Sequence, residues 1–201
     1  MRLYLIRHGK TLANERHLYC GSTDIPLTEA GIWQLKQMHY DIPPTCRFIT
    51  SGMTRTEQTL YYLCGDVAHE MDKRFQEIDF GIFEMHSYDE LKERADYREW
   101  LSGDNERNVP PLGESGVQMS TRVVTALDDL LKEQKDTVLV THGGVIAAIM
   151  QYLFPESKKN RYQWQPAPGC GYLITDQKYE ILQSKHECAE HVRGFEDSEE
   201  K

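Results

Sequence analysis

The alternation of apolar and polar residues predicts a strand followed by a helix, twice, in the first third of the chain. A short apolar run over 3–6 predicts a buried strand, and a 3.6-residue apolar period over 27–39 predicts a helix with Thr28 as its N-cap. A second apolar run over 47–51 is followed at once by a helical pattern over 53–65, which ends at a glycine. This repeated order is typical of sheets built from parallel strands.

The pattern changes between residues 75 and 111 and then returns to strands and helices. A polar helix is predicted over 87–103, and a loop rich in Pro, Asn and Gly follows it. The patterns beyond the loop predict a long amphipathic helix over 117–134, a buried strand over 137–141, an apolar helix over 144–154 that Pro155 ends, and an edge hairpin of strands over 171–175 and 179–182.

Together these elements predict one domain over residues 1–201 with an α/β fold, in which a mostly parallel sheet lies between two layers of helices. Residues 75–112 are expected to form a small cap of helix and loop beside the sheet. The acidic tail, about residues 186–201, is expected to be mobile. Ligands on such sheets bind at the carboxyl ends of the strands, beside a change in strand order.

Composition and charge limit the classes of function that this chain can have. A chain of 201 residues, 39% of them hydrophobic, suits one globular domain with a single active centre. The formal net charge of −9 repels nucleic acid and anionic membranes, so any basic site must be local. No apolar stretch reaches the roughly 20 residues of a membrane helix and no secretory signal is recognisable, so a cytoplasmic protein is expected. Five cysteines without a CxxC pair argue against a disulfide framework and a zinc knuckle.

Two strand ends carry the same kind of sequence, a histidine followed by glycine. The run "LYLI" leads into Arg7, His8 and Gly9, and "TVLVT" leads into His142 and Gly143. If the two strands are parallel neighbours, both imidazoles lie at one edge of the sheet, where the glycines let the backbone approach a ligand. The helix that begins there directs its free amide groups toward the same edge. Two histidines, free amides and an arginine at one edge of a sheet are typical of an anion-binding site.

Two other interpretations of these histidines compete with an anion site. A lone histidine at a strand end is more often part of a hydrogen-bonded turn, but the duplication of the junction favours a site. Two histidines and a carboxylate could also bind zinc. However, Arg7 is a poor neighbour for a divalent cation, and no HxH, HxxxH or HExxH spacing occurs. No metal and no cofactor are therefore expected.

Further candidates follow the second strand and open the cap. In "TSGMTRTEQT", Ser51 ends the strand and Arg55 lies about one turn into the next helix, where its guanidinium would bind phosphate oxygens in pairs. In "RFQEIDFGIFE", Glu77, Asp79 and Glu84 lie among aromatic residues. A carboxyl group among apolar neighbours can stay protonated near neutral pH, as a general acid requires. Taken alone, each of these charged residues is more often simply solvated.

The ordered motifs "RHGKTLAN", "SGMTRTEQT", the glutamate of "FQEIDFG", "LGES" and "THGG" resemble the histidine phosphatase superfamily, also called the phosphoglycerate mutase-like family. The resemblance spans most of the chain. It implies that His8 is the nucleophile and carries the phosphoryl group as a phosphohistidine. It also implies that Arg7, Arg55 and His142 hold the phosphate and that Glu77 protonates the departing oxygen.

The resemblance also assigns residues around this central group. Asn14 matches a phosphate-side residue of the first motif, and Ser22 or Thr23 is expected to contribute a hydroxyl group. Lys10 stands where many relatives have glutamate, a form associated with some α-ribazole phosphatases, and it adds a positive charge near the entrance. Glu84, a substrate-binding candidate, belongs to a "GIFEM" segment where many relatives have "GxWEG", so the local cap geometry is expected to differ.

The activity that the resemblance implies is hydrolysis of a small phosphate ester. Cofactor-dependent mutases of this family carry longer cap insertions, so a 201-residue chain with a modest cap resembles the phosphatase branch. We expect a metal-independent phosphomonoesterase that acts on a small molecule, either α-ribazole 5'-phosphate or a sugar phosphate, and not on nucleic acid or membranes. A phosphoglycerate mutase or a broad-specificity phosphatase is one alternative. A catalytically idle relative that binds phosphorylated ligands is another.

The sequence says less about the role of the aromatic residues in the cap and about the oligomeric state. Phe83, Tyr88, Tyr97 and Trp100 could stack on a base or sugar, but their helical spacing is more typical of a packed core. A homodimer is left open.

Overall fold

The computed structural model describes residues 1–104 and 106–183, so the predicted mobile tail lies outside the described residues. The helices and strands, with two short 3₁₀ helices η1 and η2, follow in chain order: β1 (Arg2–Arg7), α1 (Leu12–Glu15), α2 (Glu29–Gln37), β2 (Arg47–Thr50), α3 (Thr54–Cys64), β3 (Glu70–Met71), η1 (Lys73–Phe75), η2 (Gly81–Phe83), α4 (Tyr88–Leu91), α5 (Ala95–Leu101), α6 (Gly116–Lys132), β4 (Thr137–Thr141), α7 (Gly143–Leu153), β5 (Gly171–Thr175) and β6 (Lys178–Leu182).

Six strands form one sheet in the order β3-β2-β4-β1-β5-β6. The pairs β1 with β4, β2 with β4 and β2 with β3 are parallel, whereas β5 pairs antiparallel with β1 and with β6. Arg7 at the end of β1 lies opposite Thr141 at the end of β4. The predicted, mostly parallel sheet and the late hairpin are confirmed, and the two strands that lead into histidines are direct neighbours.

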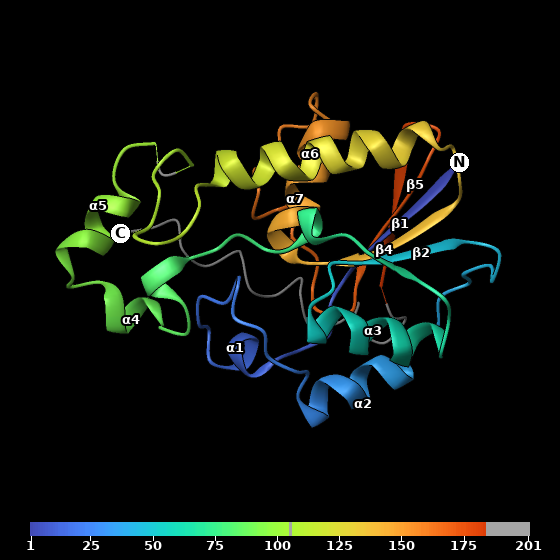
Figure 1. Ribbon diagram of the computed structural model, residues 1–201, viewed down its shortest axis with the longest axis horizontal. Coiled ribbons are helices and arrows are strands. Elements are labelled where there is room, and N and C mark those ends of the chain that lie inside the picture. The colour runs from blue at the N-terminus through green and yellow to red at the C-terminus, as the bar shows by residue number, and fades with distance from the viewer. Residues whose placement is uncertain (105, 184–201) are drawn as a thin grey trace, which may run out of the picture.

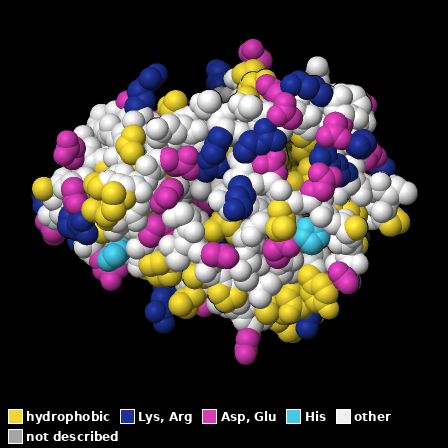
Figure 2. Space-filling view, in the orientation of Figure 1, with side chains coloured by type: hydrophobic (Ala, Val, Ile, Leu, Met, Phe, Trp, Pro, Cys, Tyr) yellow, Lys and Arg dark blue, Asp and Glu magenta, His cyan; other side chains and the backbone are white. Residues whose placement is uncertain are grey.

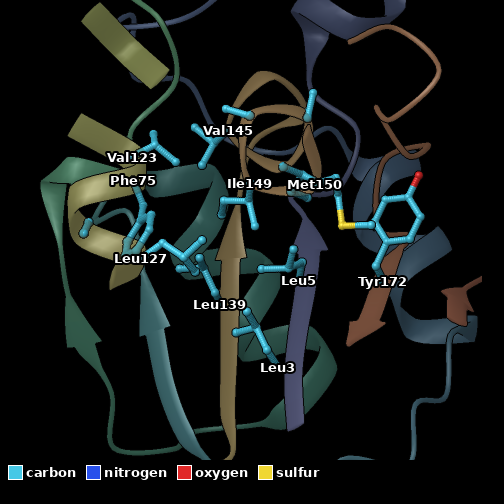
Figure 3. Close-up of a cluster of buried hydrophobic side chains, with 14 of the residues drawn as sticks. Leu3, Leu5, Phe75, Val123, Leu127, Leu139, Val145, Ile149, Met150 and Tyr172 are labelled. Carbon is cyan, nitrogen blue, oxygen red and sulfur yellow. The ribbon is translucent and has the colours of Figure 1, made fainter. Parts of the chain in front are cut away.

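Helices cover both faces of this sheet, as the sequence predicts. The helices α6 and α7 lie on one side and α2 and α3 on the other (Figure 1). Because side chains alternate along a strand, Leu3 and Leu5 pack with α6 and α7, whereas Tyr4 and Ile6 pack in the cluster that includes Leu60 of α3. The α6–α7 side of this core is drawn in Figure 3, where the labelled leucines of the strands face the helices. The three-layer α/β/α architecture is therefore confirmed.

Local signals place most helix ends where the sequence predicts them. The Thr28 side chain accepts a hydrogen bond from the Gly31 amide at the start of α2. Ser115 and Gln118 form a reciprocal capping box at the start of α6. Gly65 ends α3 with a φ of 80°, a conformation that glycine adopts without steric cost.

The predicted single helix over 87–103 is wrong, because the segment folds as α4 and α5. The chain becomes extended at Arg94, which has a ψ of 137°, before α5 begins. The break lets Leu91 of α4 and Tyr97 of α5 both pack, fully buried, against Phe83. An exposed polar helix of this length is only marginally stable through its own hydrogen bonds. Burial of these side chains in one small cap core therefore favours two short helices over one continuous helix.

The cap helices stand away from the sheet, at the end of the molecule opposite the N-terminus (Figure 1). Basic and acidic side chains are interspersed over the face shown in Figure 2, without a large patch of one sign. In the described part of the chain, no helix is long and apolar enough to cross a membrane. Two short elements, α1 and β3, were not predicted, because four and two residues give too short a pattern to recognise.

Candidate active site

The two histidines meet at the carboxyl edge of β1 and β4. The His8 amide donates a hydrogen bond to the Thr141 carbonyl (2.9 Å), which continues the β1–β4 pairing to the end of the strands. The ring centroids of His8 and His142 are 5.3 Å apart, with an interplanar angle of 61°. The sequence prediction that both imidazoles lie at one edge of the sheet therefore describes the observed geometry.

A hydrogen bond selects one tautomer of His8. Its Nδ1 lies 2.7 Å from the carbonyl oxygen of Gly9, which can only accept, so Nδ1 carries a proton. Burial lowers the pKa of His8 well below its ordinary value, and the charges of Arg55 and Arg7 lower it further. The ring is consequently neutral at physiological pH, and Nε2 keeps a free electron pair.

The ring of His142 has the opposite tautomer, fixed by a chain of hydrogen bonds. Arg55 Nε–H donates to His142 Nδ1 (3.3 Å), and a guanidinium can only donate, so the ring proton is on Nε2. His142 Nε2–H then donates to Ser51 Oγ (2.9 Å). The Ser51 hydroxyl pairs with Thr56 Oγ1 (3.1 Å), which donates to the Met53 carbonyl (2.7 Å). Burial, followed by the Arg55 charge, lowers the pKa of His142 well below its ordinary value.

The second residue of α3, Arg55, is held from three sides. Besides its contact with His142, its Nη1 donates to the Thr23 carbonyl (2.9 Å) and its Nη2 to the Gly21 carbonyl (2.7 Å). Only 1% of its surface is exposed, and this burial lowers its pKa from the usual high value. A guanidinium fixed in this way acts as a preorganised positive charge beside His8.

The other guanidinium of the site, on Arg7, lies against the start of α7. Its Nη1 donates to the Pro166 carbonyl (2.8 Å), and its buried Nε has no hydrogen-bond partner among the described residues. A Cβ at position 143 would lie 3.3 Å from this Nε, so Gly143 lets the guanidinium pack closely on the helix. Burial lowers the pKa of Arg7, whereas the nearby Glu77 raises it.

The carboxylate of Glu77 occupies the N-terminus of α7. Glu77 Oε2 accepts from the Gly144 amide (2.9 Å), and Oε1 accepts from the Ile78 amide (3.0 Å). A Cβ at position 144 would lie 2.4 Å from Glu77 Oε1, so only glycine allows this approach. The sequence predicts that the amides of this helix are free for a ligand, but here the Gly144 amide is already bonded to Glu77.

A cavity of about 190 Å³, here called the rim cavity, connects these groups. Its walls are Arg7, His8, Thr11, Asn14, Leu18, Tyr19, Cys20, Arg55, Glu77, Ile78, Phe80, Gly144, Arg161 and Gln165. It therefore places the neutral His8 imidazole, the guanidinium groups of Arg7 and Arg55, and the Glu77 carboxylate around one small space. Such an arrangement binds a tetrahedral anion and can transfer a group from it to nitrogen.

A model of the histidine phosphatase superfamily (branch 1) matches residues 3–185 of the chain. The chain belongs to this superfamily. The adenosylcobalamin/alpha-ribazole phosphatase of Salmonella typhimurium is 29% identical over 182 residues, which cover 87% of this chain and 90% of that protein. A protein of Enterobacter sp. (strain 638) named "Probable phosphoglycerate mutase GpmB" is 33% identical over 159 residues, 75% of this chain and 73% of its own.

Solved structures of the superfamily have the same fold. The alpha-ribazole phosphatase from Shigella flexneri superimposes with a TM-score of 0.78 at 26% identity, covering 92% of this chain and 95% of that one. Phosphoglycerate mutase from Thermus thermophilus gives a TM-score of 0.70 at 29% identity, with 92% and 98% covered. Phosphatases and mutases of the superfamily thus resemble this chain to a similar degree.

Several residues predicted for the site lie beside the rim cavity rather than in its wall. Glu84 accepts from the amides of Gly21 (2.9 Å) and Ser22 (3.0 Å), so its carboxylate holds the loop whose carbonyls bind Arg55. Ser22 Oγ donates to Asp79 (2.9 Å), and Thr23 contributes its backbone carbonyl to Arg55. The Ser22 hydroxyl is therefore bonded to Asp79, and the contact of Thr23 with the site is made by its backbone.

Three further candidates have structural partners of their own. Asn14 lines the rim cavity, but its Oδ1 accepts from the amide of Thr11 (3.0 Å) in the capping box of α1. Lys10 does not line the cavity, and its carbonyl accepts from the Thr28 amide (2.9 Å). His142 is fully buried in contact with His8 and Arg55, also outside the cavity wall.

Sequence patterns missed the far wall of the rim cavity. Tyr19 and Phe80 come from loops, and Arg161 and Gln165 come from the irregular segment between α7 and β5. No motif or periodicity marks these residues, because their position depends on how two distant loops pack. Within residues 1–104 and 106–183, no group of three or more His, Cys, Asp or Glu side chains could hold a metal ion.

Acidification is expected to destabilise this protein before its carboxylates titrate. The folded chain keeps His8 and His142 neutral, because burial and the neighbouring cations lower the pKa of both rings. The unfolded chain takes up these protons below about pH 6.5, so the free energy of unfolding falls by up to about 1.4 kcal/mol per pH unit for each ring. Urea denaturation between pH 7 and 5 measures the slope. His8→Gln should remove the part of the slope that His8 contributes, and an unchanged slope would contradict this account.

Proposed function

We propose that this histidine phosphatase is a metal-independent phosphomonoesterase that works through a phosphohistidine on His8. The observation that carries the proposal is the neutral His8 ring, whose Nδ1–H is bonded to the Gly9 carbonyl and whose Nε2 is therefore free to attack. Its place in the wall of the rim cavity, with Arg7 and Arg55, supports the assignment. Two fixed guanidinium groups supply the positive charge that a transferred phosphoryl group requires.

In the first step, His8 Nε2 attacks phosphorus and the bond between phosphorus and the ester oxygen breaks. Arg7 and Arg55 stabilise the charge on the phosphoryl oxygens. The departing alkoxide takes a proton from the Glu77 carboxyl group, which acts as the general acid. The alcohol leaves, and the enzyme holds a phosphoryl group on Nε2.

In the second step, water attacks the phosphoryl group and gives its proton to the Glu77 carboxylate. The bond between phosphorus and Nε2 breaks, and the electron pair returns to the ring. Inorganic phosphate leaves and His8 is neutral again. The two steps sum to hydrolysis of a phosphate monoester, with no change in oxidation state.

The substrate is proposed to be α-ribazole 5'-phosphate or a sugar phosphate. The activity named for the Salmonella and Shigella relatives supports the first, and the aromatic rings of Tyr19 and Phe80 in the rim cavity suit a planar group. A cytoplasmic location is proposed with it, supported by the free thiols of Cys20, Cys46 and Cys64. The Enterobacter relative favours phosphoglycerate mutase as the second candidate.

Turnover and trapping together test this function. The protein should hydrolyse p-nitrophenyl phosphate with EDTA present, and a radiolabelled substrate should leave an acid-labile, alkali-stable label on the protein when the reaction is quenched with alkali. Loss of activity in EDTA would indicate a metallophosphatase. Transfer of the label to glycerate faster than to water would indicate a mutase. Absence of any turnover of p-nitrophenyl phosphate, α-ribazole 5'-phosphate or sugar phosphates would indicate a module that only binds phosphorylated ligands.

A further inference from the structure

A second cavity of about 140 Å³ adjoins the rim cavity on the side away from the histidines. The two cavities share Tyr19, Ile78, Phe80, Arg161 and Gln165 in their walls, and Trp100, Leu101, Glu106, Gly116 and Tyr162 complete the second one. A phosphate ester with its phosphorus at His8 therefore extends its leaving group toward this side cavity. The residues that line both cavities are therefore placed to contact the leaving group and to favour one kind of leaving group over another.

Arg161, which lines both cavities, forms an ion pair with Glu106 of the side cavity. Arg161 Nη1 lies 2.6 Å from Glu106 Oε1 and 2.8 Å from Oε2, and both side chains are partly buried, with 20% and 43% of their surface exposed. Both contacts use the same nitrogen, so in the described part of the chain the pair does not engage Nε or Nη2. The pair also borders a wider hollow of about 740 Å³ along α6.

Backbone contacts hold Glu106 in this position. Its carbonyl accepts from the Val117 amide (3.0 Å) in the first turn of α6. Its carboxylate packs on Gly116, where an added Cβ would lie only 2.2 Å from Oε2. The glycine at the start of α6 thus leaves room for the carboxylate that pairs with Arg161 in the wall of the side cavity. The ion pair joins the cap loop to the segment after α7, two parts of the chain that are far apart in sequence.

We propose that Glu106 is a specificity residue that excludes leaving groups with a second anionic group. The proposal rests on the proposed phosphomonoesterase function. Arg161 without a partner would add a third guanidinium to the cleft and would bind a carboxylate or second phosphate on the substrate. With Glu106 in place, that charge is already neutralised, and an anionic leaving group meets a carboxylate of the same sign.

The arrangement therefore favours uncharged leaving groups, such as a nucleoside or an unsubstituted sugar. Arg7 and Arg55 remain available for the scissile phosphate, because neither is bonded to Glu106. Discrimination of this kind needs a repulsive element as well as attractive contacts. Glu106 provides that element in the wall of the side cavity.

A matched pair of substrates tests the proposal. Glycerol 3-phosphate and 3-phosphoglycerate differ only in a hydroxymethyl group that is replaced by a carboxylate. Glu106→Gln should raise kcat/KM for 3-phosphoglycerate about tenfold or more and change that for glycerol 3-phosphate by no more than about twofold. Adding Arg161→Met to Glu106→Gln should remove the gain, because the gain requires the released guanidinium.

The control is Glu93→Gln, which makes the same chemical change in the exposed Arg98–Glu93 pair of the cap and should leave the ratio of the two kcat/KM values unchanged. Gly116→Ala should displace the Glu106 carboxylate without changing the charge of the protein. Like Glu106→Gln, it should raise kcat/KM for 3-phosphoglycerate relative to that for glycerol 3-phosphate. An unchanged ratio in Glu106→Gln, with glycerol 3-phosphate still hydrolysed, would overturn the specificity role alone. No hydrolysis of either ester by the wild type would instead count against the proposed function.

Discussion

His8→Ala is expected to lower phosphatase turnover by about 10⁴-fold or more, because it removes the atom proposed to carry the phosphoryl group. The guanidinium groups of Arg7 and Arg55 do not replace it, since they stabilise charge but have no electron pair to donate. The fold should survive the change. His8 lies at the end of β1, where its backbone pairing with Thr141 does not depend on the side chain.

Steady-state kinetics and circular dichroism check both parts of this expectation. His39→Ala, at an exposed position between α2 and β2, is the matched control and should keep wild-type turnover. A smaller variant, His8→Gly, offers a sharper test, since added imidazole should enter the vacated space and restore part of the activity. Turnover by His8→Ala within tenfold of the wild type, in a folded protein, would remove the nucleophile assignment.

The paired histidine junctions show what the sequence could predict. Each follows a short apolar run, and the carboxyl ends of parallel strands meet at one edge, so a shared site followed from the pattern alone. The neutral state of His8 could not be predicted in this way. It depends on burial of the ring and on the charges of Arg55 and Arg7, and only the folded chain buries the ring and brings Arg55 beside it.

The cap shows where prediction from the sequence stops. The polar segment 87–103 has the pattern of one helix, but burial of Leu91 and Tyr97 breaks it into α4 and α5. The wall formed by Arg161 is equally invisible in the sequence, because its partner Glu106 comes from a different loop. Residues whose roles depend on contacts between loops carry no periodic signal.

Glu84 illustrates a related error of interpretation. Its spacing among aromatic residues suggested a group on the substrate side, whereas its carboxylate is bonded to the amides of the loop that includes Gly21 and Thr23. That loop supplies the two carbonyls that hold Arg55. An acidic residue near a site can therefore act on the site through the backbone, which residue type and spacing do not reveal.

Glu77→Gln is expected to slow the release of poor leaving groups by about 10³-fold and that of p-nitrophenolate by no more than about tenfold. An alkoxide such as that of glycerol needs a proton as the ester bond breaks, whereas p-nitrophenolate is stable without one. The substitution keeps an oxygen that can accept from the Gly144 amide, although the second acceptor, bonded to the Ile78 amide, is lost. It also removes the ability to give and take a proton.

Because Glu77 is also proposed to accept the proton of water in the second step, the two steps must be measured separately. A rapid burst of p-nitrophenol in Glu77→Gln, followed by slow steady turnover, is the expected signature, since phosphoryl transfer to His8 remains fast while hydrolysis of the phosphohistidine is slowed. Glu93→Gln should show wild-type behaviour in both phases. Equal losses for glycerol 3-phosphate and p-nitrophenyl phosphate in the burst phase would mean that Glu77 only positions the start of α7. A selective loss for the poor leaving group cannot come from a merely structural residue, because such a residue would affect both esters through the same geometry.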